Sequence, residues 1–439
     1  DAQASRGRDL LPALRHRRYL YLWLGLLVSI AGSQMQLAAL HWHIRTLTGE
    51  PDPLALGGIG LARILPVLVF SFIGGPVADT LNRRRILFVT QSAMALVALA
   101  LALLTWSGGI TIWWIYALTA IQATAVAFDG PARQAMIPNI VPGKDLPSAF
   151  SMSSIAMNVG SIIGPVLSGI VIATLGQGYT YLFNAISFLA VILALVLMGP
   201  VAQDTKNAPG IHFGAAVDGF RFIFSRPIIL STMLLDFVAT FFASANTMMP
   251  IVARDILHVG EIGYGWLTAA QPIGSVLAGL AVSQVQNLRK QGPKFLGAVA
   301  IFGLATILFG VSHRIGPDLV LFIRPAMTFT LAFVIGFVSL VLMGAADAVS
   351  TIIRNTIRQL NTPDHIRGRM VSVNQIFFQG GPQLGEVESG IVASLFGVPA
   401  TIVSGGIGCI VGLVFIIMKW PQLRRYNGDE HLQPVTPAG

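Results

Sequence analysis

Long apolar stretches alternate with short polar segments along most of the 439-residue chain. A helix needs about 20 consecutive apolar residues to cross a bilayer, and a window of that length finds twelve such stretches. We expect membrane-spanning helices at 19–44, 55–78, 86–107, 111–132, 148–175, 179–199, 228–250, 262–286, 295–313, 326–350, 370–396 and 398–419.

One polar connection, 201–227, is much longer than the others and separates six expected spans from the other six. The pattern therefore predicts an all-α membrane protein with twelve transmembrane helices in two six-helix halves. The expected parts are an N-terminal tail at 1–18, a first half at 19–200, a linker at 201–227, a second half at 228–419 and a C-terminal tail at 420–439.

Composition supports the membrane assignment, since 54% of the residues are hydrophobic and only 11% are charged, against about 25% in soluble domains. The net charge of +9 would suit nucleic acid if the basic residues formed one surface. Instead, 23 of the 28 Lys and Arg residues fall in segments on the side of the N-terminus and 4 on the other side. This bias predicts that both termini are cytoplasmic and requires no nucleic-acid partner.

The two halves resemble each other when they are shifted by 221 residues. Repeated halves with a binding site near the middle of the membrane are the physical plan of alternating-access transporters. We therefore expect pseudo-symmetric halves in which the fifth span corresponds to the eleventh. The matched residues are Arg133, Pro142, Gly160, Gly164, Ser168 and Gly169 with Arg354, Pro363, Gly381, Gly385, Ser389 and Gly390.

The short loop after the second span reads "GPVADTLNRRR". Gly75 permits close helix approach, Asp79 can accept hydrogen bonds near the helix end, and Arg83 and Arg84 can reach carboxylates. Three basic residues in this loop would also satisfy the positive-inside rule alone, but that rule does not explain Gly75 or Asp79. The pattern favours a latch on the cytoplasmic side.

In this loop the chain resembles the major facilitator superfamily, whose signature is Gly-x-x-x-Asp-Arg/Lys-x-Gly-Arg/Lys-Arg-Arg/Lys. Thr80 and Asn82 depart from that signature. The resemblance implies the twelve-helix major facilitator fold and a motif that locks the two halves when the cytoplasmic side is closed. Asp129 and Arg133, at the end of the fourth span, are the partners that such a latch would recruit.

The fifth span carries "GSIIGPVLSG", which resembles the superfamily's antiporter motif, Gly-x-x-x-Gly-Pro-x-x-Gly-Gly. Gly160, Gly164, Pro165 and Gly169 match the motif, and Ser168 replaces one glycine. The resemblance implies proton-driven export. The structural alternative is that the glycines only pack against another helix and that Pro165 only bends the span.

Two further segments, "AFDGPARQAMIPNIVP" at 127–142 and "RQLNTPDHIRGRM" at 358–370, resemble the bacterial branch that includes enterobactin exporters and macrolide efflux pumps. This resemblance implies a multi-pass protein of the bacterial inner membrane.

Four ionisable residues fall inside expected spans: Arg63, Asp236, Glu386 and Glu388. Each costs at least ~2.5–3.5 kcal/mol on insertion scales, so each is a candidate for proton coupling or gating. At about 1.5 Å per residue, Arg63 and Glu386 both lie roughly 24 Å from the cytoplasmic end of their spans. Because the second and eleventh spans face each other in the superfamily fold, Arg63 is the expected partner of the glutamates.

The two glutamates point about 200° apart on a helix, so they cannot have the same role. We expect Glu388, on a small-residue face, to meet Arg63 at an outer gate, and Glu386 to face the substrate pathway. The alternative is that these two roles are exchanged. The polar stripe that carries Glu386 also carries Gln375, Gln379, Gln383 and Gly390.

Asp236 is expected in the inner third of the seventh span, where it is either a proton-exchange site or an aspartate at the start of the helix. Other polar residues inside spans are cavity candidates or form hydrogen bonds between helices. His41 and His43 are interpreted as interfacial residues beside Trp42, because a spacing of two is poor for a helical metal site. The polar residues considered are Gln34, Gln36, Gln122, Asn158, Asn184, Asn246 and Gln271.

The sequence thus favours a secondary transporter that exports a small amphipathic compound, such as a drug, siderophore or lipid-like molecule, by proton antiport. The sequence lacks an ATP-binding motif, and we expect no cofactor and no metal. The expected partners are the substrate, protons and the bilayer, and the expected state is a monomer. Uptake by proton symport on the same fold is the first alternative, and a membrane enzyme or receptor is the second.

Overall fold

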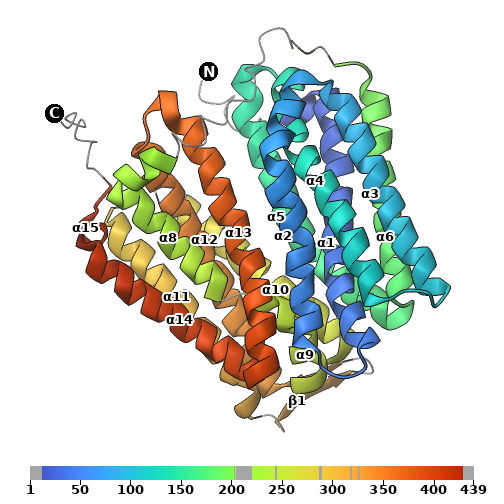
Figure 1. Ribbon diagram of the computed structural model, residues 1–439, viewed down its shortest axis with the longest axis vertical. Coiled ribbons are helices and arrows are strands. Elements are labelled where there is room, and N and C mark those ends of the chain that lie inside the picture. The colour runs from blue at the N-terminus through green and yellow to red at the C-terminus, as the bar shows by residue number, and fades with distance from the viewer. Residues whose placement is uncertain are drawn as a thin grey trace, which may run out of the picture. The chain divides into compact units, whose positions relative to one another are not determined.

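The computed structural model describes residues 12–201, 203, 220–242, 245–285, 289–316, 319–324 and 327–428 (Figure 1). At 71–76, 78–79, 245–246, 321–324, 327–329, 364–365, 367–369, 371–372, 375–376 and 378–379 it describes the backbone alone.

Almost all of the described chain is helical. The first helices are α1 (Arg17–Leu47), α2 (Pro53–Thr80), α3 (Arg83–Trp106), α4 (Ile112–Ile140), α5 (Leu146–Thr174) and α6 (Gln177–Met198), with short 3-10 turns η1 (Pro12–Arg15) and η2 (Gly143–Asp145). The later elements are α8 (Pro227–Phe242), η3 (Ala245–Met248), α9 (Met249–Ile251), η4 (Val252–Ile256), α10 (Gly260–Ser283), α11 (Gln291–Val311), η5 (Ser312–Arg314), β1 (Val320–Arg324), β2 (Met327–Thr330), α12 (Leu331–Leu360), α13 (Asp364–Phe396), α14 (Val398–Lys419) and α15 (Pro421–Arg425).

Ten helices among the described residues are long and apolar enough to cross a membrane. α8 is apolar but has only 16 residues, and α13 has 33 residues but carries several polar ones. The all-helical membrane fold predicted from the sequence is therefore confirmed, with ten of the twelve expected spans meeting both criteria.

The prediction of one continuous helix for the seventh span, 228–250, is wrong. α8 ends at Phe242, and the chain continues through the short pieces η3, α9 and η4. Pro250 occupies the first turn of α9, where its missing N–H group costs nothing. The same proline inside a continuous helix would remove a hydrogen bond.

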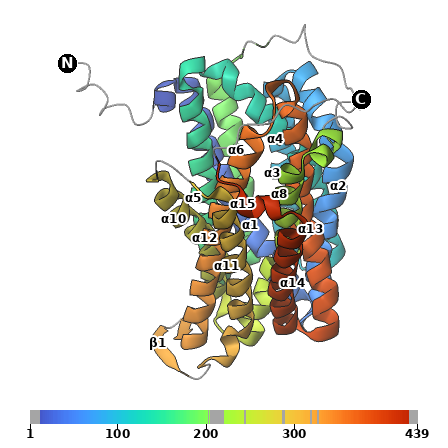
Figure 2. The same cartoon turned by 90° about the vertical axis from the view of Figure 1, so that its left-hand side faces the viewer.

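The tenth span was expected to start at 326, but an antiparallel hairpin of β1 and β2 occupies 320–330. The Thr330 side chain then caps the next helix by accepting a hydrogen bond from the Phe333 N–H. Helix α12 therefore begins at Leu331 and continues to Leu360, ten residues beyond the predicted end. Figure 2 shows the hairpin beyond the ends of α11 and α12.

The chain forms two compact units. Unit 1 comprises Asp1–Pro51, Leu61–Ile211 and Gly260–Ala269, and unit 2 comprises Asp52–Gly60, His212–Val259 and Ala270–Gly439. The first turns of α2 thus group with the later helices, and the first turns of α10 group with the earlier ones. The predicted division into halves at 19–200 and 228–419 stays a prediction.

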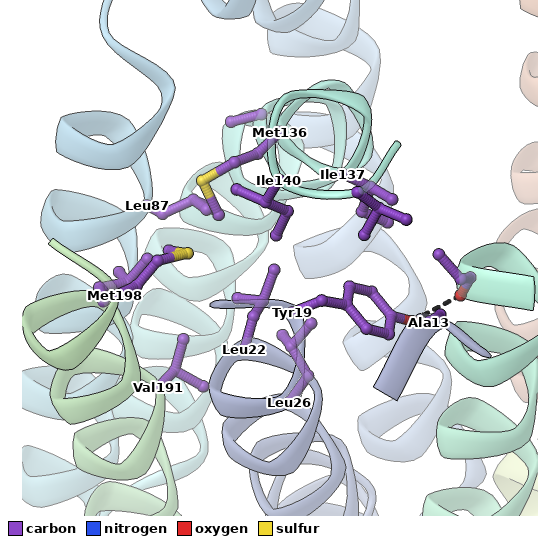
Figure 3. Close-up of a cluster of buried hydrophobic side chains, with 14 of the residues drawn as sticks. Ala13, Tyr19, Leu22, Leu26, Leu87, Met136, Ile137, Ile140, Val191 and Met198 are labelled. Carbon is purple, nitrogen blue, oxygen red and sulfur yellow. Dashed lines mark hydrogen bonds between the residues drawn. The ribbon is translucent and has the colours of Figure 1, made fainter. Parts of the chain in front are cut away.

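The core of unit 1 gathers where α1 packs against α4, α5 and α6 (Figure 3). The Tyr19 hydroxyl, within this cluster, donates a hydrogen bond of 2.6 Å to the Ala149 carbonyl. Deeper in the unit, Gln36 donates to Gln122 and accepts from Asn184 at 2.7 Å. The expectation that these amides join helices by hydrogen bonds is confirmed for α1, α4 and α6.

Unit 2 has its own apolar core between α8, α11, α12 and α14. Phe295, Leu235 and Ile357 are completely buried in it. Burying such a side chain stabilises a fold by about 1.5–3 kcal/mol in water, but lipid replaces water around these helices and tight packing carries more of the stability.

Two glycines of α5 bring its backbone against α1. A Cβ atom added to Gly164 would lie 2.6 Å from the Ala31 carbonyl oxygen and 2.9 Å from the Met35 nitrogen. One added to Gly160 would lie 3.1 Å from the Ala31 nitrogen. Since these neighbours are backbone atoms, only glycine fits at this contact.

Glycines also form two crossings that repeat each other. In unit 1, an added Cβ on Gly169 of α5 would lie 2.5 Å from the Glu261 carbonyl oxygen and 3.2 Å from Gly265 Cα of α10. In unit 2, one on Gly390 of α13 would lie 2.9 Å from the Pro53 carbonyl oxygen and 3.0 Å from Gly57 Cα of α2.

The two crossings are related residue by residue. The shift from Gly169 to Gly390 is 221 residues, and the shift from Gly57 to Gly265 and from Pro53 to Glu261 is 208 residues. The repeat predicted at a shift of 221 residues is therefore matched by α5 and α13, whereas α2 and α10 are related by a different shift of 208 residues.

We predict that Gly164→Ala lowers the stability of the purified protein by about 1–3 kcal/mol, because the added methyl group has no room beside α1. The matched control is Gly130→Ala in α4, where an added Cβ has no neighbour within 4 Å. Both glycines precede a proline, whose ring disfavours a helical alanine before it. The control carries this cost as well, so it should lose less stability than Gly164→Ala. Thermal unfolding in detergent measures both variants, and equal midpoints would contradict the packing argument.

Candidate functional site

A cluster of buried charges joins α8 to α12 inside unit 2. Asp236 of α8 is 4% exposed, and Arg354 and Arg358 of α12 are 2% exposed each. Arg354 Nη1 lies 2.7 Å from Asp236 Oδ1, and Arg358 Nη2 lies 3.7 Å from Asp236 Oδ2. One carboxylate thus faces two guanidinium groups in a space that excludes water.

Both arginines make further polar contacts, although Arg354 Nε has no hydrogen-bond partner among the described residues. Arg354 Nη1 also donates to Ser350 Oγ at 3.2 Å and lies 3.5 Å from Asp347 Oδ1. Arg358 donates to the Thr232 hydroxyl and carbonyl at 3.3 and 3.2 Å, and to the Asn374 side chain of α13. The cluster therefore ties α8, α12 and α13 together.

Sequence reasoning missed the two arginines of this cluster. It placed Arg354 and Arg358 in a cytoplasmic loop, whereas α12 continues to Leu360 and buries both. No Gly or Pro occurs between residue 350 and Pro363, so the helix continues past the end of its apolar stretch. The signal that could have revealed them is their spacing of four, which puts both on one face of a helix.

Asp236 is the tenth residue of the sixteen in α8. It is therefore not at the start of its helix, which removes one of the two interpretations made from the sequence. The half-exposed Asp347, whose side chain is 44% exposed, supplies the second negative charge of the cluster. Two carboxylates against two arginines make the group neutral as a whole.

Glu386 packs against α2 within unit 2. It is 9% exposed, and a Cβ added to Gly60 of α2 would lie 2.8 Å from Glu386 Cβ and 3.2 Å from its Oε2. Gln383, one turn earlier on α13, is equally buried, and its carbonyl oxygen would lie 2.7 Å from the same added atom. The polar stripe of α13 thus forms the contact with the glycines of α2.

Of the two glutamates, Glu386 contacts the glycines of α2, and Glu388 is half-buried on another face. The sequence left open which glutamate has which role, and the pairing of either one with Arg63 stays a prediction. The small-residue face expected to approach a neighbouring helix does so at Gly381, where an added Cβ would lie 2.5 Å from Thr240 Oγ1 of α8. Gly57 and Gly60 of α2 leave room for Gln383 and Glu386 of the polar stripe, and the sequence prediction did not include these two glycines.

The other polar candidates lie apart from one another. Gln34 of α1 donates to Ser161 of α5 at 2.8 Å, and Asn158 is exposed. Gln271 of α10 lies 4.0 Å from the Met343 sulfur. Gln383 Oε1 is buried without a hydrogen-bond partner in the part of the chain that the structure describes. The side chains of Gln375 and Gln379 lie outside the described residues.

Arg63 lies on α2, three residues after Gly60. It is half-buried and interacts electrostatically with His41 of α1. The histidines and Trp42 are buried at 2–7% exposure, so their interpretation as interfacial residues is wrong. His43 bonds to the Tyr181 hydroxyl at 3.0 Å, because α6 covers this end of α1.

The arginines of the loop motif hold helix ends in unit 1. Arg83 Nη1 donates to the Ala135 carbonyl at 2.9 Å and to Asn139 at 3.0 Å, near the end of α4. Arg84 Nε donates to the Leu195 carbonyl near the end of α6 at 2.9 Å. Positively charged donors at these carbonyls are stabilised by the partial negative charge at the C-terminal ends of the helices. At Gly75 and Asp79 the structure describes the backbone alone, so the contacts expected of the Asp79 side chain lie outside the described residues.

Asp129 is 3% exposed inside unit 1. It accepts hydrogen bonds from Thr90 and Gln91 of α3 at 3.0 and 2.8 Å, and Arg133 Nη2 lies 3.6 Å from its other oxygen. Arg133 is the repeat equivalent of Arg354. Both arginines contact a buried aspartate. The aspartate of Arg133 lies on the same helix, α4, whereas the aspartate of Arg354 lies on a different helix, α8.

No group of three or more His, Cys, Asp or Glu side chains within the described segments could hold a metal ion.

Comparison with known proteins identifies the relatives of this chain. The model of a family described as transmembrane secretion effectors matches residues 10–435. The multidrug efflux pump Tap of Mycolicibacterium fortuitum is 26% identical over 90% of this chain and 94% of its own length. The enterobactin exporter EntS of Salmonella choleraesuis is 23% identical over 84% of this chain and 83% of its own length.

Solved structures give the same fold. A POT family transporter, solved in complex with 5-aminolevulinic acid, superposes with a TM-score of 0.72 at 13% identity. The match covers 92% of this chain and 96% of that one. The predicted major facilitator fold and the resemblance to enterobactin exporters are thus confirmed.

We predict that Asp236→Asn destabilises the protein by about 3–5 kcal/mol, because it leaves two arginines buried without their carboxylate. The matched control is Asp347→Asn, whose half-exposed pair should contribute at most about 1 kcal/mol. Thermal unfolding in detergent compares the two variants.

A double-mutant cycle tests the pairing itself. The double variant Asp236→Asn/Arg354→Gln should lose much less stability than the sum of the losses in the two single variants, because the partners interact. Strictly additive losses, or equal losses for Asp236→Asn and Asp347→Asn, would show that the cluster is not held by this pair.

Proposed function

The chain belongs to the transmembrane secretion effector family of the major facilitator superfamily, and on that premise we propose that it exports a small amphipathic compound in exchange for protons. It is a multi-pass membrane transporter rather than an enzyme. The proposed location is the bacterial inner membrane, with both termini in the cytoplasm, as the Lys and Arg distribution favours.

Export is supported by the relatives, whose names describe a multidrug efflux pump and an enterobactin exporter. An amphipathic substrate is supported by the surroundings of Asp236. Phe237 follows it directly and stacks on Phe241 at 5.8 Å between ring centroids, and Phe377 of α13 meets Phe237 edge-on at 6.1 Å. All three rings are partly exposed, so they offer apolar faces beside a polar cluster.

Proton coupling is carried by one observation, the burial of Glu386 at the crossing of α2 and α13. A carboxylate beside Gly60, on a residue that is 9% exposed, has little water to stabilise its charge. The crossing is therefore most stable when Glu386 is neutralised, by a proton or by a cation. Opening the crossing admits water and favours the charged form, so proton binding and helix separation oppose each other.

Arg63 is the cation that we propose as the alternative to a proton. It follows Gly60 by one turn of α2, and it keeps the partnership with a glutamate expected from the sequence. In the proposed cycle a proton and Arg63 compete for Glu386. The crossing of α2 and α13 can then close with Glu386 either protonated or paired with Arg63, and only the protonated form carries a proton across the membrane.

Asp236 is proposed as a second proton site. Protonation would remove the single carboxylate that both Arg354 and Arg358 share and would leave them free to attract another anionic group. The loop motif of Gly75, Asp79, Arg83 and Arg84, with Asp129 and Arg133, is proposed as the latch on the cytoplasmic side. The antiporter-like segment with Pro165 is proposed to guide the fifth span during alternating access.

We predict that Glu386→Gln abolishes export driven by a pH gradient while exchange of substrate for substrate continues, because the amide is permanently neutral. Glu388→Gln is the matched control, since it removes the same charge two residues away on a half-buried face. Proteoliposomes loaded with a compound selected from a panel of dyes, macrolides and siderophores provide the measurement, with and without the gradient.

Full gradient-driven export by Glu386→Gln would remove this glutamate from proton coupling. Compound accumulation in the direction of the proton flux, in the unmodified protein, would instead establish symport on the same fold.

A further inference from the structure

The chain after α14 folds back against the start of α11. Leu423 is completely buried, and Tyr426 is 1% exposed. The Gly292 N–H donates to the Tyr426 carbonyl at 2.9 Å, and Asn361 of α12 donates to the Tyr426 hydroxyl at 2.9 Å. These anchors hold residues 420–428 as a fixed part of unit 2.

This folded segment brings two groups of basic residues together. The Lys290 N–H donates to Asn427 Oδ1 at 2.9 Å, so the segment before α11 touches the segment after α15. No Asp or Glu occurs at 289–294 or at 419–428. We call the exposed basic residues the basic collar, and they are Arg289, Lys290, Lys294, Lys419, Arg424 and Arg425.

Apolar surface leads directly to the basic collar. On α14, Val411, Phe415 and Met418 are 61%, 57% and 76% exposed and lie on one helical face that ends at Lys419. Lys419 Nζ lies 5.8 Å from the centre of the Phe415 ring and 5.4 Å from that of Trp420. An aromatic belt with snorkelling lysines is typical of the boundary between lipid tails and headgroups.

Helix α11 has a second exposed apolar face on Ile301, Leu304 and Leu308. Figure 1 shows α11 beside α14, with α15 next to the same end of both helices. A molecule that satisfies all these features has a negatively charged head and long apolar chains.

We propose that the basic collar is a binding site for the phosphate headgroup of an anionic phospholipid, whose acyl chains lie along the exposed faces of α11 and α14. Basic clusters at the end of a transmembrane helix attract anionic lipids. Free phosphate would use the charges but not the apolar faces. This proposal does not depend on the direction of transport.

The test compares lipid retained by the full-length protein after reconstitution into vesicles that contain cardiolipin in both leaflets, followed by extraction in mild detergent. The variant combines Lys419→Gln, Arg424→Gln and Arg425→Gln, which removes three exposed charges and keeps the buried Leu423 and Tyr426. Native mass spectrometry counts the bound cardiolipin.

The matched control combines Arg17→Gln, Arg18→Gln and Lys144→Gln, three exposed basic residues of unit 1. We expect the collar variant to lose most of the cardiolipin and the control to retain it, with phosphatidylcholine unaffected in both. Equal loss in the two variants would reduce the effect to general attraction by basic residues and overturn the site. Retention in both variants, or full displacement by inorganic phosphate, would overturn it as well.

Discussion

Two arginines share one buried aspartate, and the arrangement of α8, α12 and α13 depends on that contact. Charges are costly where water and lipid headgroups cannot reach them, so none of the three groups can move alone. The cost fixes the position of α12 along α8, since Arg354 and Arg358 must reach Asp236 from one helical face. Asn374 extends the constraint to α13 through its bond with Arg358.

The glycine crossings impose a different constraint, because they specify shape and not charge. At Gly57 with Gly390, and at Gly265 with Gly169, two backbones meet where a single methyl group would collide. Such contacts depend on close approach of the two backbones. Charge thus fixes the helices α8, α12 and α13 within unit 2, whereas glycine sets how closely the crossing helices approach each other.

The sequence predicted features that depend on long-range patterns and missed those that depend on local helix ends. Twenty-residue apolar stretches and the 221-residue repeat were sufficient for the fold, because both survive small errors in boundaries. Arg354 and Arg358 were missed, since hydropathy marks where apolar residues stop and not where the helix stops. The sequence also left open which of Glu386 and Glu388 approaches the second span. The periodicity of α13 separated their directions, but only the small residues of α2 decided which face could pack closely.

One of the positions that differ between the two crossings bears on the proposed exchange. Pro165 and Glu386 are equivalent in the repeat, and their carbonyl oxygens make equivalent contacts, at 2.6 Å from a Cβ on Gly265 and 2.9 Å from one on Gly57. The backbone contact is therefore conserved between halves, while the side chain changes from an apolar ring to a carboxylate. A proline cannot gain or lose a proton, so this position of the crossing of α5 and α10 cannot respond to pH. In the proposed exchange, the crossing of α2 and α13 responds to protons through Glu386, which occupies the equivalent position.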